Sequence, residues 1–172
     1  MYSIAVCDDD EAYIGRIKEY IYEMFSKDCV KIFEYSDGAD LVCDIESVFF
    51  DIILLDIAMP GLDGIETAKR IRNSRVCGNS AIIFISSHAA DVSEIVDLAP
   101  FAYIYKKKLE EELRVKLIKA IDSLRDDESI CFVSKRKYIK IRYRDIMYIQ
   151  ADRNSIVIYT NNEKYVSRSY KL

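Results

Sequence analysis

The 172-residue chain has few of the residues that metal clusters and irregular folds need: it contains one histidine, two prolines and five glycines. It also lacks an apolar run of the roughly 18 residues that a membrane-spanning helix requires. The N-terminus passes from Met1 directly into Tyr-Ser-Ile-Ala-Val-Cys, without the basic region and apolar block of a signal peptide. Because 51% of the residues are hydrophobic, the chain can bury a core. We therefore expect a soluble protein that is not exported.

The cysteines argue against a disulfide framework, since their number is odd and no two of them lie close together. They are Cys7, Cys29, Cys43, Cys77 and Cys131. Only His88 could supply an imidazole, so a metal cluster of cysteine and histidine is not expected either. We predict buried free thiols in a reducing cytoplasm.

The net charge of −4 conceals a difference between the two ends of the chain. Residues 131–172 contain ten Lys or Arg and three Asp or Glu, a charge of +7, which leaves 15 basic and 26 acidic residues, or −11, for residues 1–130. This break indicates two modules with different partners, of which the second would contact a polyanion. The alternative is a solvated strand face that carries lysines.

Residues 1–126 alternate short apolar runs with amphipathic stretches, the pattern of strands linked by helices in a parallel sheet. Five runs are predicted to be strands buried on both faces: Ser3–Cys7, Val30–Tyr35, Asp51–Asp56, Ala81–Ser86 and Phe101–Tyr105. Two helical stripes follow from apolar residues at steps of three and four: Ile14, Ile17, Ile21 and Met24, then Leu113, Leu117, Ala120 and Leu124. The predicted fold class is α/β, with five βα units in a doubly wound parallel sheet.

After residues 125–129 the pattern changes from helical spacing to period two. Ile139, Ile141 and Tyr143 alternate with cationic residues, which predicts a strand with one apolar and one basic face. Residues 155–160 and 164–167 are predicted to form a hairpin around Asn161-Asn162, because asparagine tolerates the backbone of tight turns. We place the boundary near 126–130, which gives a first domain of residues 1–126 and a short, partial all-β module of residues 127–172.

Acidic residues follow two of the predicted strands. Asp8-Asp9-Asp10-Glu11 come after the first strand, and Asp56 ends the third. In a doubly wound sheet the carboxyl ends of strands beside the topological switch share a crevice, so these carboxylates can converge. Carboxylates brought together repel one another, and oxygen-only ligands favour a hard cation such as Mg²⁺. Taken alone, an acidic cluster of this kind more often marks the N-terminus of a helix.

Four segments together resemble the receiver domains of two-component response regulators. They are the acidic cluster, Asp56-Ile-Ala-Met-Pro-Gly-Leu-Asp-Gly64, Ile-Ile-Phe-Ile-Ser86 and Phe-Ala-Tyr-Ile-Tyr-Lys106. The family carries its phosphoacceptor in the motif D-x-x-M-P-x-x-D/N-G, which begins here at Asp56. The resemblance covers residues 1 to about 125. It implies a flavodoxin-like fold in which a sensor histidine kinase phosphorylates Asp56 with the help of Mg²⁺.

The resemblance also implies the metal ligands. Asp8 and Asp9 would bind Mg²⁺ together with Asp56 and the backbone carbonyl of Ala58, whereas Asp10 would cap the first helix.

The phosphoryl group would meet a second set of residues. Ser86 and Lys106 would contact it, and Tyr103 would be the aromatic that turns inward when the Ser86 hydroxyl moves. Without the motif, Lys106 would be an exposed lysine at a helix start and Tyr103 a packed strand aromatic.

Three residues either depart from the family pattern or could influence how long the phosphate lasts. Lys107 stands where the family usually has proline after its lysine. Ala58 and His88 flank the phosphorylation site, where side chains influence the attack of water. We hypothesise that the small Ala58 fails to orient water and gives a long-lived phosphate, with His88 acting in the opposite direction.

Residues 130–172 resemble the opening of a LytTR output domain, a β-rich DNA-binding module. The resembling stretch runs from Lys137 to Thr160. By position, Arg153 and Asn154 match the first DNA-reading loop, and both side-chain types can reach bases or phosphates. Because such a domain normally needs about a hundred residues, DNA is expected as a partner of a full-length form. This chain should bind DNA weakly at best.

The predicted function is that of a response regulator whose phosphorylation on Asp56 switches transcription. Self-phosphorylation and slow autodephosphorylation are the only reactions expected, so the chain is not predicted to be an enzyme. Homodimerisation on phosphorylation is a further expectation, and no membrane partner is expected. One alternative is a phosphorelay or interaction receiver without DNA output. Another is a Mg²⁺-dependent phosphatase, although Asp56-Ile-Ala58 does not fit the D-x-D pattern of that class.

Overall fold

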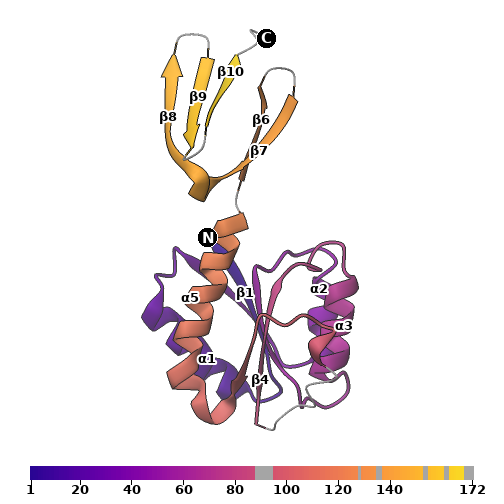
Figure 1. Cartoon of the computed structure of the whole chain (residues 1–172). Coiled ribbons are helices and arrows are strands. Elements are labelled where there is room, and N and C mark those ends of the chain that lie inside the picture. The colour runs from indigo at the N-terminus through magenta and orange to yellow at the C-terminus, as the bar shows by residue number, and fades with distance from the viewer. Residues whose placement is uncertain (88–94, 128, 135–136, 153–154, 161–162, 169–172) are drawn as a thin grey trace. The chain divides into compact units, whose positions relative to one another are not determined.

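The computed structural model describes residues 1–87, 95–127, 129–134, 137–152, 155–160 and 163–168 (Figure 1). It divides into two compact units, Met1–Ala120 and Ile121–Leu172. The division falls inside the last helix of the first unit, a few residues before the boundary that the change of periodicity predicts. Among the described residues, no helix combines the length and the apolar character needed to cross a membrane.

The first unit is built on a five-stranded sheet in the order β2-β1-β3-β4-β5, with every neighbouring pair parallel. The strands are β1 (Tyr2–Cys7), β2 (Val30–Tyr35), β3 (Ile52–Asp56), β4 (Ala81–Ser86) and β5 (Ala102–Tyr105). The described helices are α1 (Glu11–Met24), α2 (Gly38–Asp44), α3 (Gly64–Asn73) and α5 (Leu109–Asp127), with the 3-10 turn η1 (Lys106–Lys108) before α5. Figure 1 shows α1 and α5 on one face of the sheet and α2 and α3 on the other. The predicted α/β doubly wound fold is confirmed.

Burial differs between the central and the edge strands. β3 is buried at every residue, and β1 and β4 along most of their length. β2 and β5 form the two edges of the sheet and are only partly buried. The prediction that all five strands are buried on both faces is therefore wrong for these two, because an edge strand has a neighbour on one side only.

The predicted apolar stripes cover the sheet from one side. Ile14, Ile17 and Ile21 of α1 are buried, as are Leu113, Leu117 and Ala120 of α5. Met24 and Leu124 end the two stripes and are half-buried. On the other face, α2 and α3 bury Leu41, Ala68 and Ile71. Each helix thus uses one face for packing, as amphipathic helices do.

The described cysteines are free thiols, but only some are buried. Cys7 and Cys77 lie in the core, whereas Cys29 and Cys43 are exposed. The prediction of buried thiols is wrong for these two, because Cys29 lies in the turn before β2 and Cys43 on the outer surface of α2. The side chain of Cys131 lies outside the described residues.

After the end of α5, the second unit consists of antiparallel strands, so the predicted small β module is present. β6 (Ser129–Ser134) pairs with β7 (Lys137–Arg142), and a 3-10 turn, η2 (Tyr143–Asp145), follows. β8 (Ile146–Asp152), β9 (Ser155–Thr160) and β10 (Lys164–Arg168) form a three-stranded sheet in the order β10-β9-β8. The predicted strand ends early: Tyr143 lies in η2, with half its surface exposed, and does not continue the alternation of β7.

Candidate functional site

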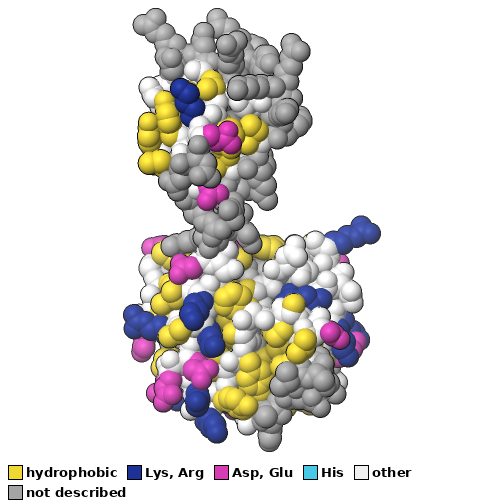
Figure 2. Space-filling model, viewed as in Figure 1, with side chains coloured by type: hydrophobic (Ala, Val, Ile, Leu, Met, Phe, Trp, Pro, Cys, Tyr) yellow, Lys and Arg dark blue, Asp and Glu magenta, His cyan; other side chains and the backbone are white. Residues whose placement is uncertain are grey.

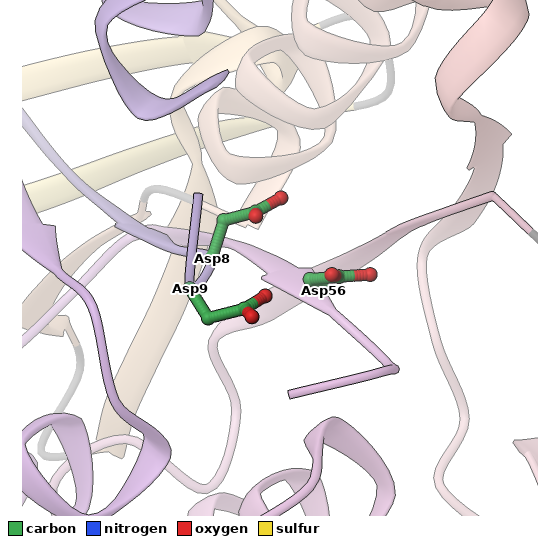
Figure 3. A group of neighbouring side chains, drawn as sticks. All are labelled: Asp8, Asp9 and Asp56. Carbon is green, nitrogen blue, oxygen red and sulfur yellow. The ribbon is translucent and has the colours of Figure 1, made fainter. Parts of the chain in front are cut away.

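The carboxylates of Asp8, Asp9 and Asp56 meet at the carboxyl ends of β1 and β3 (Figure 3). Cys7 pairs with Leu55 across these neighbouring strands, so the residues that follow them arrive side by side. One oxygen from each carboxylate lies within 4.8 Å of the others. The predicted convergence of acids from two strands is thus what the sheet register produces.

Asp8 is almost entirely buried, and its two oxygens differ. Oδ1 accepts a hydrogen bond of 3.0 Å from the backbone N–H of Asp10. Oδ2 is buried and has no hydrogen bond of regular geometry among the described residues, although a cationic side chain lies close to it. Burial raises the pKa of the Asp8 carboxyl above its ordinary value. A buried carboxylate of this kind costs free energy unless a cation compensates for it.

Lys106 supplies one such cation from the far side of the site. It follows β5, whose Tyr105 pairs with Ser86 at the end of β4. Its Nζ lies 2.6 Å from Oδ2 of Asp8 and 2.9 Å from Oδ2 of Asp56. Burial alone would lower the pKa of Lys106, but its bonds to the two carboxylates raise it overall. Its side chain is only 17% exposed, whereas Lys107 and Lys108 are exposed.

One ammonium cannot neutralise three carboxylates. Asp9 is exposed and Asp56 buried, so the cluster has one side open to solvent. A set made only of carboxylate oxygens suits a hard cation such as Mg²⁺, which keeps several waters and needs few protein ligands. Oδ2 of Asp8 already has the Lys106 ammonium as its partner, so the structural reason for a metal at this place is the negative charge that remains on the three carboxylates.

The motif that begins at Asp56 builds the loop between β3 and α3. Met59 is buried, with its Sδ 3.6 Å from Sγ of Cys7, which ties the loop to β1. Gly61 takes a positive φ of 78° that favours glycine. Asp63 caps α3, where its Oδ1 accepts a hydrogen bond from the backbone N–H of Glu66.

Gly64 shows why the motif ends in glycine. A Cβ at this position would lie 1.9 Å from the backbone oxygen of Asp56, far inside van der Waals contact. Its N–H also donates a bond of 2.9 Å to the carbonyl of Ile57. The start of α3 is therefore packed directly against the backbone of the predicted phosphoacceptor.

The remaining predicted residues differ in their burial and in the part of the site that they border. Ser86 is buried at the end of β4, one position beyond Ile85, which pairs with Asp56. Tyr103 is half-buried, with its ring 5.2 Å from that of Tyr105. Ala58 is exposed, and its N–H donates to Oδ1 of Asp56 at 3.4 Å.

Three predicted residues lie outside the described part of the chain: His88, Arg153 and Asn154. The prediction for Asp10 is confirmed, since its side chain accepts hydrogen bonds from the N–H groups of Ala12 and Tyr13 at the start of α1.

The sequence motifs did not point to Tyr13, which the structure brings to the site. Its hydroxyl donates a hydrogen bond of 3.2 Å to the carbonyl of Lys106, and Nζ of Lys106 lies 4.6 Å from the centre of its ring. The only sequence signal is an aromatic residue in the first turn after the acidic cluster.

Solved structures resemble the first unit in fold. The response regulatory domain of protein mrkE from Klebsiella pneumoniae has a TM-score of 0.62 at 24% identity, covering 70% of this chain and 96% of that one. The receiver domain of sensor histidine kinase PA1611 from Pseudomonas aeruginosa PAO1 has a TM-score of 0.62 at 21% identity, covering 70% and 98%. That structure is described with a magnesium ion coordinated in its active site cleft.

Sequence comparison finds transcriptional regulators among the relatives of this chain. The transcriptional regulatory protein YpdB of Escherichia coli (strain K12) is 28% identical over 146 residues, which cover 77% of this chain and 59% of YpdB. The chain thus spans about three fifths of the length of this relative. The family model for the response regulator receiver domain matches residues 4–121, so the chain belongs to the receiver domain family of two-component response regulators.

Proposed function

We propose that Asp56 accepts a phosphoryl group from a sensor histidine kinase and that this reaction switches a transcriptional output. The observation that carries the proposal is the set of charges around Asp56. The carboxylates of Asp8 and Asp9 lie within 4.8 Å and could hold a metal ion with it, and the ammonium of Lys106 lies 2.9 Å away. Phosphoryl transfer depends on positioning and on the neutralisation of spread negative charge. Both requirements are met around this one carboxylate.

In the proposed reaction a carboxylate oxygen of Asp56 attacks phosphorus in line with the leaving group. A bond forms between Oδ and phosphorus while the bond from phosphorus to the phosphohistidine nitrogen breaks; the leaving imidazole keeps the electron pair and takes up a proton. The ammonium of Lys106 neutralises a phosphoryl oxygen on one side. Mg²⁺, held by Asp8, Asp9, Asp56 and the carbonyl of Ala58, would supply the same neutralisation on the other.

Two further residues complete the proposed switch. The Ser86 hydroxyl donates to a phosphoryl oxygen once its loop closes, and Tyr103 on the neighbouring strand turns inward in response. In support, Ser86 lies at the end of β4, next to β3, which ends in Asp56. Ser86 pairs with Tyr105 and Phe84 with Tyr103, so β5 is the strand that a shift at the end of β4 would reach first.

The test is intact-protein mass spectrometry after incubation with acetyl phosphate and Mg²⁺. We expect one phosphate adduct on the wild type, none on Asp56→Asn, and none when a chelator replaces Mg²⁺. Asp40→Asn, which changes an exposed acid on α2, is the matched control and should behave as the wild type. An unmodified wild-type protein, or an adduct that persists in Asp56→Asn, would contradict the proposal. Because the reaction stops after one phosphoryl group, no turnover of a simple phosphate ester is expected.

The proposed output is a LytTR-type DNA-binding domain, to which the second unit would contribute its first strands. The antiparallel strands of this unit and the charge of +7 on residues 131–172 support this assignment, as does the similarity to YpdB, a transcriptional regulatory protein. For this chain we expect weak DNA binding that falls with salt, because contacts to phosphates dominate. Tight, sequence-specific binding in a mobility-shift titration would contradict that expectation.

The site of action is also a proposal. Four free thiols among the described residues suit the reducing cytoplasm, where a sensor kinase would present its phosphohistidine.

A further inference from the structure

Tyr13 contacts Lys106 at both ends of the lysine. The tyrosine hydroxyl donates to the Lys106 carbonyl at 3.2 Å, and the ammonium lies 4.6 Å from the centre of the tyrosine ring. The whole flexible stem of the lysine side chain separates these two points. A side chain that holds both the backbone and the tip restricts the rotamers between them.

Lys106 needs such restriction because its side chain is long, and within its own turn only its backbone is held, by the N–H of Leu109, which donates to its carbonyl. It opens η1, a turn of three consecutive lysines in which the preceding Tyr105 provides no side-chain cap. Its ammonium rests on Asp8 and Asp56, and it must leave the oxygen of Asp56 when that oxygen carries phosphorus. A lysine stem has large rotamer entropy, so a free ammonium would spread over many positions at that moment.

The face of an aromatic ring suits an ammonium that must move from the Asp56 oxygen to the phosphoryl group. It attracts a cation through its quadrupole without a fixed hydrogen-bond direction, so the ammonium can shift along the ring and stay near the phosphoryl group. Burial raises the pKa of Tyr13 to about 12, so the hydroxyl remains a proton donor near neutral pH. The backbone of Tyr13 is itself fixed, because its N–H donates to Oδ1 of Asp10.

The acidic run therefore has two tasks in the structure. Asp8 and Asp9 turn their carboxylates to the site, while Asp10 caps α1 and so orients Tyr13. We propose that Tyr13 is a positioning residue for Lys106, holding its carbonyl and its ammonium so that the ammonium meets the phosphoryl group on Asp56. This inference rests on the proposed phosphorylation of Asp56.

The experiment compares rate constants of phosphorylation by acetyl phosphate for Tyr13→Phe, Tyr13→Leu and the wild type, followed by intact mass. Tyr13→Leu loses both contacts and should be about three- to tenfold slower, the range that a partly buried cation–π contact gives. Tyr13→Phe keeps the ring and should lie between it and the wild type. Tyr20→Phe, on the same helix with its hydroxyl on Glu110, is the control and should not change the rate.

A double-mutant cycle separates positioning from general destabilisation. In a Lys106→Met background, Tyr13→Leu should slow phosphorylation no further, because the ammonium that Tyr13 positions is absent. An equal loss in both backgrounds would overturn the proposal. A second readout is independent of rate: the ε-methylene protons of Lys106 should show a ring-current shift in the wild type and Tyr13→Phe that disappears in Tyr13→Leu.

The outcomes also separate this inference from the proposed function. A wild type that takes up no phosphoryl group refutes the proposed function. A wild type that is phosphorylated, with Tyr13→Leu equally fast, refutes the role of Tyr13 alone.

Discussion

Replacing Lys106 by methionine should destabilise the metal-free protein, because it removes the ammonium and keeps a stem of similar length. Nζ lies 2.6 Å from Asp8 and 2.9 Å from Asp56, whose side chains are only 2% and 4% exposed. Removing one partner of a buried ion pair costs about 3–5 kcal/mol, since a buried charge is left uncompensated. Because Lys106 itself is 17% exposed and water can reach its place, we expect about 3 kcal/mol.

Mg²⁺ should recover part of this loss. A ligand at a hundred times its dissociation constant stabilises the state that binds it by about 2.7 kcal/mol. In the variant, no ammonium competes with the metal for Asp8, so Mg²⁺ binds more tightly than in the wild type. The difference in stability between the two proteins should therefore narrow by at least about 1 kcal/mol when Mg²⁺ is added.

The assay is urea unfolding followed by circular dichroism, with and without Mg²⁺. Lys107→Met is the matched control, since its side chain is exposed and the change should cost less than about 0.5 kcal/mol. A Lys106→Met protein as stable as this control in the absence of metal would refute the reasoning. So would a stability difference that Mg²⁺ leaves unchanged.

Three further outcomes follow from the site. Because its carboxylate partners outweigh burial and hold the pKa of Lys106 above 10.5, this group stabilises the fold fully below pH 10.5. That contribution is lost as the pH rises through the pKa of Lys106 in the folded protein. The urea midpoint of the wild type should therefore fall in this pH range, and the midpoint of Lys106→Met should fall less. Gly64→Ala should cost about 2–4 kcal/mol by the same measurement, because its Cβ meets the Asp56 carbonyl, whereas Gly15→Ala, in open space on α1, should stabilise by about 0.5–1 kcal/mol. Ala58→Asn should shorten the lifetime of the acyl phosphate, measured by loss of the adduct over time, and equal lifetimes would reject a role for Ala58 in orienting water.

The sequence predicted the parts of the site that lie at strand ends. Short apolar runs specify the strands, and a parallel register then places the residues after β1 and β3 next to each other. For this reason Asp8, Asp9 and Asp56 could be expected together. Lys106 could be expected at the same edge only through the family motif, since three consecutive lysines give no local reason to choose one of them.

Contacts made by helix faces could not be predicted in the same way. Tyr13 and Arg72 lie on α1 and α3, and what they touch depends on how each helix is rotated against the sheet. Arg72 donates to four backbone carbonyls, including those of Leu98 and Ala99, far along the chain. Ala99 has a positive φ of 43°, so this arginine holds a strained turn before β5. Neither contact leaves a spacing pattern in the sequence.

The charges at the site predict different effects for the loss of the metal and the loss of the lysine. Three carboxylates and one ammonium leave a net charge of −2, which a divalent cation would cancel. Phosphorylation replaces the single charge of Asp56 by about −2 on the phosphoryl group. The product therefore carries about −1 with both cations, −2 without Lys106 and −3 without Mg²⁺. Chelation should thus abolish phosphorylation by acetyl phosphate, whereas Lys106→Met should only slow it. A variant that is blocked as fully as the chelated wild type would show that Lys106 does more than neutralise charge.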